Sequence, residues 1–400
     1  MAELRGQSKC PLAGRKILQI IPELNSGGAE RATIDIAAAL AAVGARALVA
    51  SAGGRMVSEL QAKGGTWLAF PAQTKNPLAM LLNQRRLAEL IRGESVALVH
   101  ARSRAPAWVG YGATRQTRTP FVTTFHGAYS GSSALKLRYN SIMAKGDAVI
   151  ANSAFTAEHI AGLYPFAAEK IRVIERGIDF RLFSPNDVDP SRVQALRQAW
   201  QVAPGERIIL LAARLTPRKG HKILVEAAQR LLADGLSDTK FILAGDEQGH
   251  NAYLKDLDAA IAEAGLAGIV RRIGHCADMP AALLAAALVV VPSTEPETFG
   301  RVAAEAQAMG TPVVVTDLGA LPDVVLAPPE VAGDARTGWR VAPGNAQALA
   351  AAMRGALGLG ATARDALSAR ARAHVLQHFS VARMQAETLA VYAALLAPQV

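Results

Sequence analysis

Residues 292–313 read PSTEPETFGRVAAEAQAMGTPV and contain two glutamates, Glu297 and Glu305, with seven residues between them. An apolar run, Ala285 to Val291, precedes this stretch, and a second, Val313 to Val315, follows it. The pattern predicts a strand, a loop, a short helix, a turn and another strand, with acidic groups on the loop and the first helical turn. In an open parallel sheet, ligands bind at the carboxyl ends of the strands, where this loop would lie.

The two glutamates also have a structural interpretation. Acidic residues are favoured near helix starts because they complement the positive end of the helix dipole, and one glutamate there is more often a capping residue than a catalytic one. Two of them, beside a glycine and a short helix closed by Gly310-Thr311-Pro312, form a rarer combination. Eight residues along a helix would separate the two carboxylates by roughly 12 Å, too far to flank one bond.

The composition indicates a globular chain of two domains. The chain has 400 residues, of which 51% are hydrophobic, and single cores stop growing at about 250–300 residues. No apolar run reaches the roughly 18 residues that span a bilayer, and the N-terminal segment has no apolar signal-peptide core. The two cysteines, Cys10 and Cys276, lie far apart, so neither a zinc site nor a disulfide framework is expected. We expect a cytoplasmic protein.

The net charge of +10 is concentrated in one half of the chain. Residues 1–200 contain 25 Lys and Arg against 14 Asp and Glu, whereas residues 201–400 contain 18 against 19. This asymmetry indicates an anionic partner for the first half, which can be a membrane surface, an anionic substrate or nucleic acid, although genome composition can also enrich arginine. The candidate basic groups are Arg85, Arg86, Arg92, Arg102, Arg104, Arg115, Arg118, Lys136, Arg138 and Lys145.

Apolar β-branched runs alternate with Ala/Leu-rich helical patterns throughout the chain, which is typical of repeated βα units with parallel sheets. The candidate strands are Lys16–Ile21, Ala47–Ala50, Ala97–His100, Phe121–Phe125, Ala148–Ala151 and Ile171–Ile174 in the first half, and Ile208–Ala212, Lys240–Ala244, Ile269–Ile273, Leu288–Val291 and Pro312–Thr316 in the second. Two such domains in tandem leave a cleft between them, which is a preferred place for a ligand.

Two Pro-containing turn signals in residues 183–189 (FSPNDVD) interrupt this alternation and mark a boundary near residue 190, in a linker at about 182–205. The predicted parts are residues 1–190, residues 191–378, and a C-terminal helix over residues 379–400 that begins with Ser380 as N-cap. We expect this helix to pack back on the first domain through Met384, Leu389, Tyr392 and Leu395.

Two further segments follow predicted strands. Arg214, Arg218 and Lys219 lie in a turn that opens a helix, where backbone N–H groups and cations together suit a diphosphate. Gly27 and Gly28 follow the first strand and allow a ligand to approach the backbone. Neither G-x-G-x-x-G nor G-x-x-x-x-G-K-[ST] occurs, so the dinucleotide fingerprint and the P-loop are both excluded.

Two weaker signals remain. His126, followed by Gly127, lies at the carboxyl end of a predicted strand, although a lone histidine is more often structural. Asp187 and Asp189 have the D-x-D form of a metal–nucleotide site. They lie in the predicted linker beside Pro190, which favours a solvated loop.

Taken together, these residues resemble the retaining glycosyltransferases of family 4, of the type that builds bacterial envelope polysaccharide or lipopolysaccharide. That family has the GT-B fold, in which two Rossmann-like, doubly wound parallel-sheet domains face each other across a cleft. The resemblance runs through most of the chain. The matching motifs are Ser26-Gly27-Gly28-Ala29-Glu30, His126-Gly127, Ala151-Asn152-Ser153, Val173-Ile174-Glu175-Arg176-Gly177-Ile178-Asp179, Arg214 with Lys219-Gly220, Ala244-Gly245-Asp246, and Glu297 with Phe299-Gly300, Glu305 and Gly310-Thr311-Pro312-Val313.

The resemblance implies a role for each site residue. Arg214 and Lys219 would bind the donor diphosphate and stabilise the charge that develops as the nucleotide leaves. Glu297 would bind hydroxyls of the donor sugar, and Glu305 would bind the ribose, so that the two carboxylates hold two ends of one donor. The remaining implied contacts are the backbone N–H groups of Phe299, Gly300 and Arg301, the close approach of Gly27 and Gly28 to the phosphates, and His126 near the reacting sugar.

The implied activity is a hexosyl transfer, with retention of configuration, from a UDP- or GDP-hexose to a glycolipid or polysaccharide. No metal or other cofactor is expected, and the basic first domain would place the enzyme peripherally on the inner face of the cell membrane. One departure is Glu175-Arg176-Gly177, where many relatives have Asn-Gly, and no role is assigned to it.

Other classes of protein remain open. A sugar-nucleotide epimerase can use the same fold, whereas a phosphorylase is disfavoured because no pyridoxal-binding lysine context is recognisable. A basic nucleic-acid-binding protein is disfavoured because zinc spacing and aromatic-interleaved basic motifs are both missing and aromatic residues make up only 5% of the chain.

Overall fold

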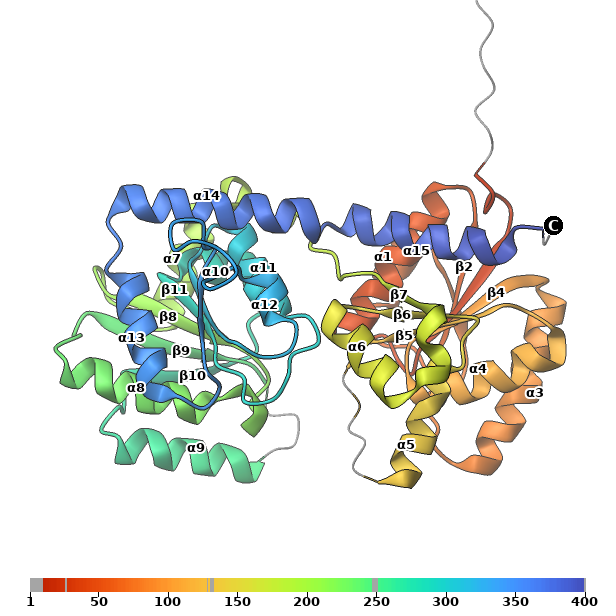
Figure 1. Ribbon diagram of the computed structural model, residues 1–400, viewed down its shortest axis with the longest axis horizontal. Helices are drawn as coiled ribbons and strands as arrows, with labels where there is room; N and C mark the ends of the chain where they lie inside the picture. The colour runs from red at the N-terminus through yellow and green to blue at the C-terminus, as the bar shows by residue number, and fades with distance from the viewer. Residues whose placement is uncertain (1–9, 26, 128, 130–132, 247–250, 399–400) are drawn as a thin grey trace, which may run out of the picture. The chain divides into compact units, whose positions relative to one another are not determined.

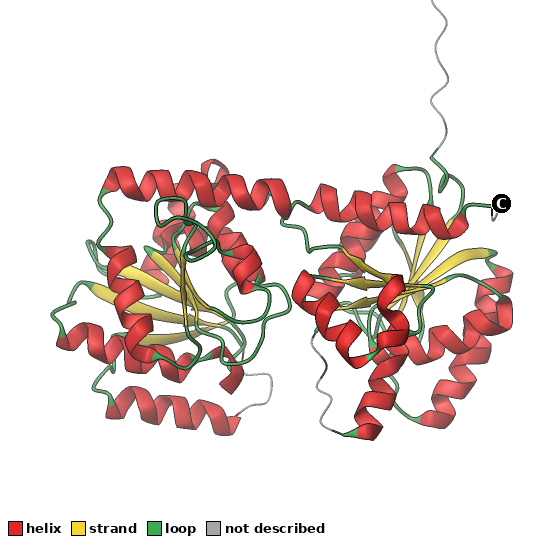
Figure 2. Ribbon diagram, viewed as in Figure 1, coloured by secondary structure: helices red, strands yellow, loops and turns green. Residues whose placement is uncertain are grey.

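The computed structural model describes residues 10–25, 27–127, 129, 133–246 and 251–398, and these form two compact units. The first unit combines residues up to Gly177 with the segment that begins at Val381, and the second runs from Ile178 to Ser380. Each unit has one parallel sheet that is covered by helices (Figures 1 and 2).

The first unit contains a seven-stranded parallel sheet with the strand order β3-β2-β1-β4-β5-β6-β7. The strands are β1 (Lys16–Ile20), β2 (Arg46–Ser51), β3 (Thr66–Ala69), β4 (Val96–Ala101), β5 (Phe121–Phe125), β6 (Ala148–Ala151) and β7 (Ile171–Val173). The helices are α1 (Gly28–Ala42), α2 (Val57–Ala62), α3 (Pro77–Gly93), α4 (Arg104–Thr117), α5 (Ala134–Asn140), α6 (Ala154–Leu163) and α15 (Val381–Leu396), with the 3-10 turns η1 (Ser141–Ala144) and η2 (Pro165–Lys170).

The second unit contains a six-stranded parallel sheet with the strand order β10-β9-β8-β11-β12-β13. The strands are β8 (Arg207–Ala212), β9 (Thr239–Ala244), β10 (Val270–Gly274), β11 (Leu288–Val291), β12 (Val313–Thr316) and β13 (Trp339–Val341). The helices are α7 (Pro190–Ala199), α8 (His221–Ala233), α9 (Asn251–Glu263), α10 (Met279–Ala285), α11 (Arg301–Ala308), α12 (Leu321–Val324), α13 (Ala346–Leu357) and α14 (Ala361–His378), with the 3-10 turns η3 (Pro185–Asp187) and η4 (Pro217–Lys219).

The predicted fold class of two doubly wound parallel-sheet domains is therefore confirmed. The central strands β8, β11 and β12 are buried almost throughout, as expected for strands with helices on both faces. The apolar patterning did not indicate β3 or β13. Both strands are short and lie at sheet edges, and none of their side chains is fully buried.

The boundary between the units differs from the one predicted near residue 190. Residues 178–190 belong to the second unit, because Ile178, Phe183 and Val188 are buried in its hydrophobic core. At the other end of the chain, α15 belongs to the first unit, where Tyr392 is fully buried.

Candidate functional site

The second sheet has its topological switch point between β8 and β11. The chain leaves β8 toward β9 on one side of the sheet and leaves β11 toward β12 on the other. Loops at the carboxyl ends of two such strands diverge and leave room for a ligand between them. Here the loop after β8 carries Arg214 and Lys219, and the loop after β11 carries Glu297.

Gly220 fixes where the loop after β8 meets the loop after β11. Its φ of 71° lies in the left-handed region, and a Cβ built there would be 1.8 Å from the carbonyl oxygen of Pro292. Only glycine fits such an approach. The 3-10 turn η4 ends directly before it, so Lys219 is held next to the loop after β11.

The backbone of Glu297 is held by a second glycine, Gly319. A Cβ on Gly319 would lie 2.3 Å from the carbonyl oxygen of Glu297, and the N–H of Ala320 donates to that same oxygen at 2.8 Å. Glu297 therefore lies in an ordered loop before α11 and not on the helix. The 12 Å separation predicted for Glu297 and Glu305 assumed a continuous helix, and that premise is wrong.

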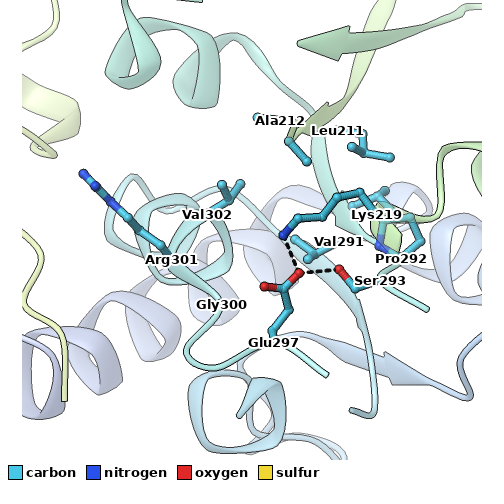
Figure 3. Close-up of a pocket in the computed structure, with 12 residues that line it drawn as sticks. Leu211, Ala212, Lys219, Val291, Pro292, Ser293, Glu297, Gly300, Arg301 and Val302 are labelled. Carbon is cyan, nitrogen blue, oxygen red and sulfur yellow. Dashed lines mark hydrogen bonds and ion pairs between the residues drawn. The ribbon is translucent and has the colours of Figure 1, made fainter. Parts of the chain in front are cut away.

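The carboxylate of Glu297 contacts Lys219 and Ser293 (Figure 3). The ammonium of Lys219 forms an ion pair with Oε1, and the hydroxyl of Ser293 donates to the same oxygen at 2.6 Å. Burial alone would raise the pKa of Glu297, but the Lys219 charge and the hydrogen bonds from Lys219 and Ser293 outweigh it and hold the pKa below 4.5. Glu297 is therefore ionised at neutral pH.

These side chains border a cavity of about 120 Å³ in the second unit. It is lined by Leu211, Ala212, Ala213, Lys219, Val290, Val291, Pro292, Ser293, Glu297, Gly300, Arg301 and Val302. Small and apolar residues from the ends of β8 and β11 surround the ion pair of Lys219 and Glu297, and Arg301 also lines the cavity. Such a site can bind a polar ligand that offers both an anionic group and hydroxyls.

Helix α11 begins beside this cavity. Its N-cap Gly300 has a φ of 89°, and a Cβ there would be 2.5 Å from Leu321. Phe299 is buried in the core of the unit, so only its backbone is suited to contact a ligand. The side chain of Arg301 extends away from the Lys219–Glu297 pair (Figure 3) and donates through Nε to Glu305 at 2.5 Å.

Glu305 is 4% exposed and is not among the residues that line the cavity. Burial raises the pKa of its carboxyl above 4.5, although the ion pair with Arg301 opposes this shift. The structure thus gives the two glutamates different surroundings, with Glu297 ionised beside a lysine and Glu305 less acidic than usual.

Arg214 has an exposed side chain and is not among the residues that line the cavity. Of the two predicted phosphate-binding side chains, only Lys219 therefore borders it. Ser293 was not predicted. The sequence signal for it was weak, because a serine two residues after a strand is common in loops of every kind.

The other predicted site residues lie in the first unit. Gly27, with a φ of 137°, is the N-cap of α1, and a Cβ on Gly28 would be 1.7 Å from Nη1 of Arg176. Nη2 of Arg176 donates to Nδ1 of His126 at 3.0 Å. The structure thus brings Gly28, His126 and Arg176 together, whereas Ser26 lies outside the described residues.

Asp187 and Asp189, which form the D-x-D pair, both have structural roles. Asp189 is the N-cap of α7 and accepts from the N–H of Ser191 at 2.8 Å, while Asp187 ends η3. Across the described ranges, no group of three or more His, Cys, Asp or Glu side chains is arranged to hold a metal ion. No described helix is long and apolar enough to cross a membrane.

Comparison with known proteins gives matches along most of the chain. Residues 26–182 match the family model described as "Glycosyltransferase Family 4", and residues 193–374 match the one described as "Glycosyl transferases group 1". A curated D-inositol 3-phosphate glycosyltransferase from Jonesia denitrificans is 33% identical over 257 residues, which are 63% of this chain and 58% of that protein. The chain thus spans less than two thirds of the length of this relative.

Solved structures also match nearly the whole chain. A glycosyltransferase from Rickettsia africae has a TM-score of 0.86 and 34% identity, covering 96% of this chain and 100% of its own. HepE from Anabaena, crystallised with UDP and glucose, has a TM-score of 0.80 and 29% identity, covering 95% of this chain and 100% of its own.

Proposed function

We propose that this chain, which belongs to glycosyltransferase family 4, transfers a hexose from a UDP- or GDP-hexose to a hydroxyl of a glycolipid or polysaccharide, with retention of configuration. The observation that carries the proposal is the Lys219–Glu297 pair at the switch point of the second sheet. The UDP and glucose bound to HepE support a nucleotide-sugar donor. The acceptor class suggests a step in lipopolysaccharide or exopolysaccharide synthesis.

Lys219 supplies the positive charge at the leaving group. An ammonium has three N–H donors, and its contact with Glu297 uses one of them. The others can bind the donor diphosphate, where a fixed charge stabilises the negative charge that develops as the bond to the sugar breaks. Backbone N–H groups at the start of α11 add partial positive charge to the same cavity.

Glu297 holds the sugar. Lys219 and Ser293 both contact Oε1, so Oε2 provides further acceptor sites for sugar hydroxyls. Because Lys219 and Ser293 keep the carboxylate ionised, Glu297 accepts hydrogen bonds and has no proton to give. In this proposal Glu297 and Glu305 are two binding groups rather than an acid–base pair.

No metal or other cofactor takes part, so excess EDTA should leave the transfer rate unchanged.

The donor is identified by screening purified protein against UDP-glucose, UDP-galactose, UDP-GlcNAc and GDP-mannose, by thermal shift and by hydrolysis.

In Lys219→Ala, kcat/KM should fall by about 10- to 150-fold, because a charge-assisted contact worth roughly 1.5–3 kcal/mol is lost. Lys222→Ala is the matched control, since Lys222 lies on the exposed side of α8 beside Asp256. Wild-type activity in Lys219→Ala would show that Lys219 does not bind the donor diphosphate.

We propose that the first unit meets an anionic membrane. On α3, Leu78, Leu81 and Leu82 are 75%, 52% and 54% exposed, with Arg85 and Arg86 exposed one turn further on. On α5, Leu135 is 80% exposed beside exposed Lys136 and Arg138. Exposed leucines next to cations suit a surface with anionic headgroups and an apolar interior.

Both helices contact Trp108 of α4, and we propose that their exposed leucines and cations form one membrane-binding surface. Gln84 of α3 donates to the backbone oxygen of Trp108 at 3.2 Å, and Nε1 of Trp108 donates to the backbone oxygen of Tyr139 of α5 at 3.1 Å. Two of the cations considered from the sequence do not belong to this surface. Arg102 is buried and donates to Gln19, and Arg104 packs over the ring of Tyr129.

Sedimentation with vesicles tests the membrane proposal. The chain should bind vesicles rich in phosphatidylglycerol and not pure phosphatidylcholine, and changing Leu78, Leu81, Leu82 and Leu135 to Ser should abolish binding. Leu376→Ser is the control, because Leu376 is 41% exposed on α14, which belongs to the second unit. Equal sedimentation of wild type with both vesicle types at low salt would refute the proposal.

A further inference from the structure

We propose that Arg176 is a positioning residue that fixes His126 as the imidazole with its proton on Nε2, so that His126 serves the substrate as a hydrogen-bond donor and not as a base. The role at the sugar rests on the proposed function. The position of the proton is a property of the protein alone, and it can be measured without any substrate. This assigns a task to a residue for which the sequence alone gave none.

The geometry of the contact sets the tautomer. Nη2 of Arg176 lies 3.0 Å from Nδ1 of His126 and 3.5 Å from the backbone oxygen of the same residue. A guanidinium has only N–H donors and stays protonated throughout the range in which proteins fold. Nδ1 must therefore present its lone pair, and the single proton of the ring must be on Nε2.

Gly28 provides the space that the guanidinium occupies. A Cβ on Gly28 would lie 1.7 Å from Nη1 and 2.9 Å from Cζ of Arg176. Gly28 has an ordinary backbone conformation, because its φ is not among the positive ones. The requirement for glycine is therefore steric, and any side chain at position 28 would displace Arg176 from His126.

The electrostatics around His126 agree with this assignment. Burial lowers the pKa of His126 well below 6.5, and the charges of Arg176 and Arg102 lower it further. If the ring were protonated to imidazolium, its positive charge would face the guanidinium of Arg176 directly. Nδ1 would then have no lone pair to accept the hydrogen bond from Arg176. Glu30 lies near Arg176, and burial raises the pKa of its carboxyl although Arg176 opposes the shift.

The chemical consequence is a restriction on what His126 can do. A histidine in the opposite tautomer could accept a proton or a hydrogen bond at Nε2, as a general base must. With the proton on Nε2, His126 can only donate there, which suits a hydroxyl or ring oxygen of a sugar. In the proposed reaction it would orient the sugar while the charge is stabilised elsewhere.

The direct test is a two-bond ¹H–¹⁵N correlation spectrum of the histidine side chains, taken on the full chain without ligand. The His126 signals, assigned by their loss in His126→Gln, should show a bare Nδ1 and a protonated Nε2. In Arg176→Met they should shift to a mixture of tautomers, and Arg176→Lys should restore part of the wild-type pattern. Arg172→Met, on an exposed side chain of β7, should change nothing.

Gly28→Ala gives an independent check that leaves Arg176 itself intact. It should reproduce the tautomer mixture of Arg176→Met, and both variants should lose about tenfold in kcat/KM, the size of one hydrogen bond. A wild-type Nε2–H pattern in both variants, or a bare Nε2 in the wild type, would overturn the proposal. A chain with the expected spectra but no transferase activity would instead refute only the proposed function.

Discussion

Changing Ser293 to alanine should disable sugar transfer while leaving the fold and the nucleotide site intact. Ser293 is fully buried in the loop after β11, and its hydroxyl donates to Oε1 of Glu297 at 2.6 Å. Its backbone oxygen accepts from the hydroxyl of Thr316 at 2.9 Å, a contact that alanine keeps. The substitution therefore removes one hydrogen bond to an ionised carboxylate and little else.

The magnitude follows from the charge on Glu297. A hydrogen bond to a charged group contributes about 1.5–3 kcal/mol, and about 1.4 kcal/mol corresponds to a factor of ten. If Glu297 must hold the sugar in the transition state, kcat/KM should fall by about 10- to 150-fold. The pKa of Glu297 should rise, since one of the groups that hold it down is lost.

The assay compares kcat/KM for transfer with the dissociation constant for the free nucleoside diphosphate, measured calorimetrically. The value of kcat/KM should fall, whereas the dissociation constant should stay within about twofold of the wild-type value. The free nucleoside diphosphate has no sugar for Glu297 to hold. Thr294→Ala is the control at a neighbouring exposed position, whose backbone N–H still donates to the backbone oxygen of Arg218 at 2.9 Å. Wild-type kinetics in Ser293→Ala would show that the observed hydrogen bond has no part in catalysis.

Three further predictions test other parts of the structure. Gly319→Ala should lower transfer at least tenfold, because its Cβ would lie 2.3 Å from the backbone oxygen of Glu297, and unchanged kinetics would contradict the account of that loop. In urea unfolding, the stability of Glu305→Gln relative to wild type should increase as the pH rises from below the unfolded-state pKa of Glu305 to above its raised folded-state pKa. The raised pKa of Glu305 means that its contribution to stability is full below the unfolded-state pKa and is lost as the pH rises through the folded-state pKa; a constant difference in unfolding free energy would refute this. Tyr392→Phe should cost about 1–3 kcal/mol in the same assay, because the 2.6 Å hydrogen bond to buried His100 is lost, and an unchanged unfolding midpoint would count against it.

The architecture was predictable because most strands are buried on both faces. Runs such as 288–291 and 313–315 are continuously apolar, which sets them apart from the helices between them. The edge strands β3 and β13 lack that signal. The boundary near residue 190 was misplaced because turn residues show where the chain bends, whereas the core that buries Phe183 depends on tertiary packing.

The site was predictable in its parts but not in its contacts. Lys219 and Glu297 were expected at strand ends, and the strand order brings those ends together. Their ion pair, the hydrogen bond from Ser293 and the location of Glu297 off the helix depend on the glycine contacts at positions 220 and 319. Arg176 could not be assigned from sequence, because its partners His126 and Gly28 are 50 and 148 residues away along the chain.

The central claim is that Glu297 holds the donor sugar and not the nucleotide. Its most direct test is the ratio of two affinities in Glu297→Gln, for the intact nucleotide-sugar and for the free nucleoside diphosphate. Glu295→Gln, on an exposed carboxylate near Arg218, is the matched control. We predict that transfer and the extra affinity for the sugar are lost while diphosphate binding is nearly unchanged. An equal loss of affinity for both ligands would contradict the claim and place Glu297 on the nucleotide or in the fold.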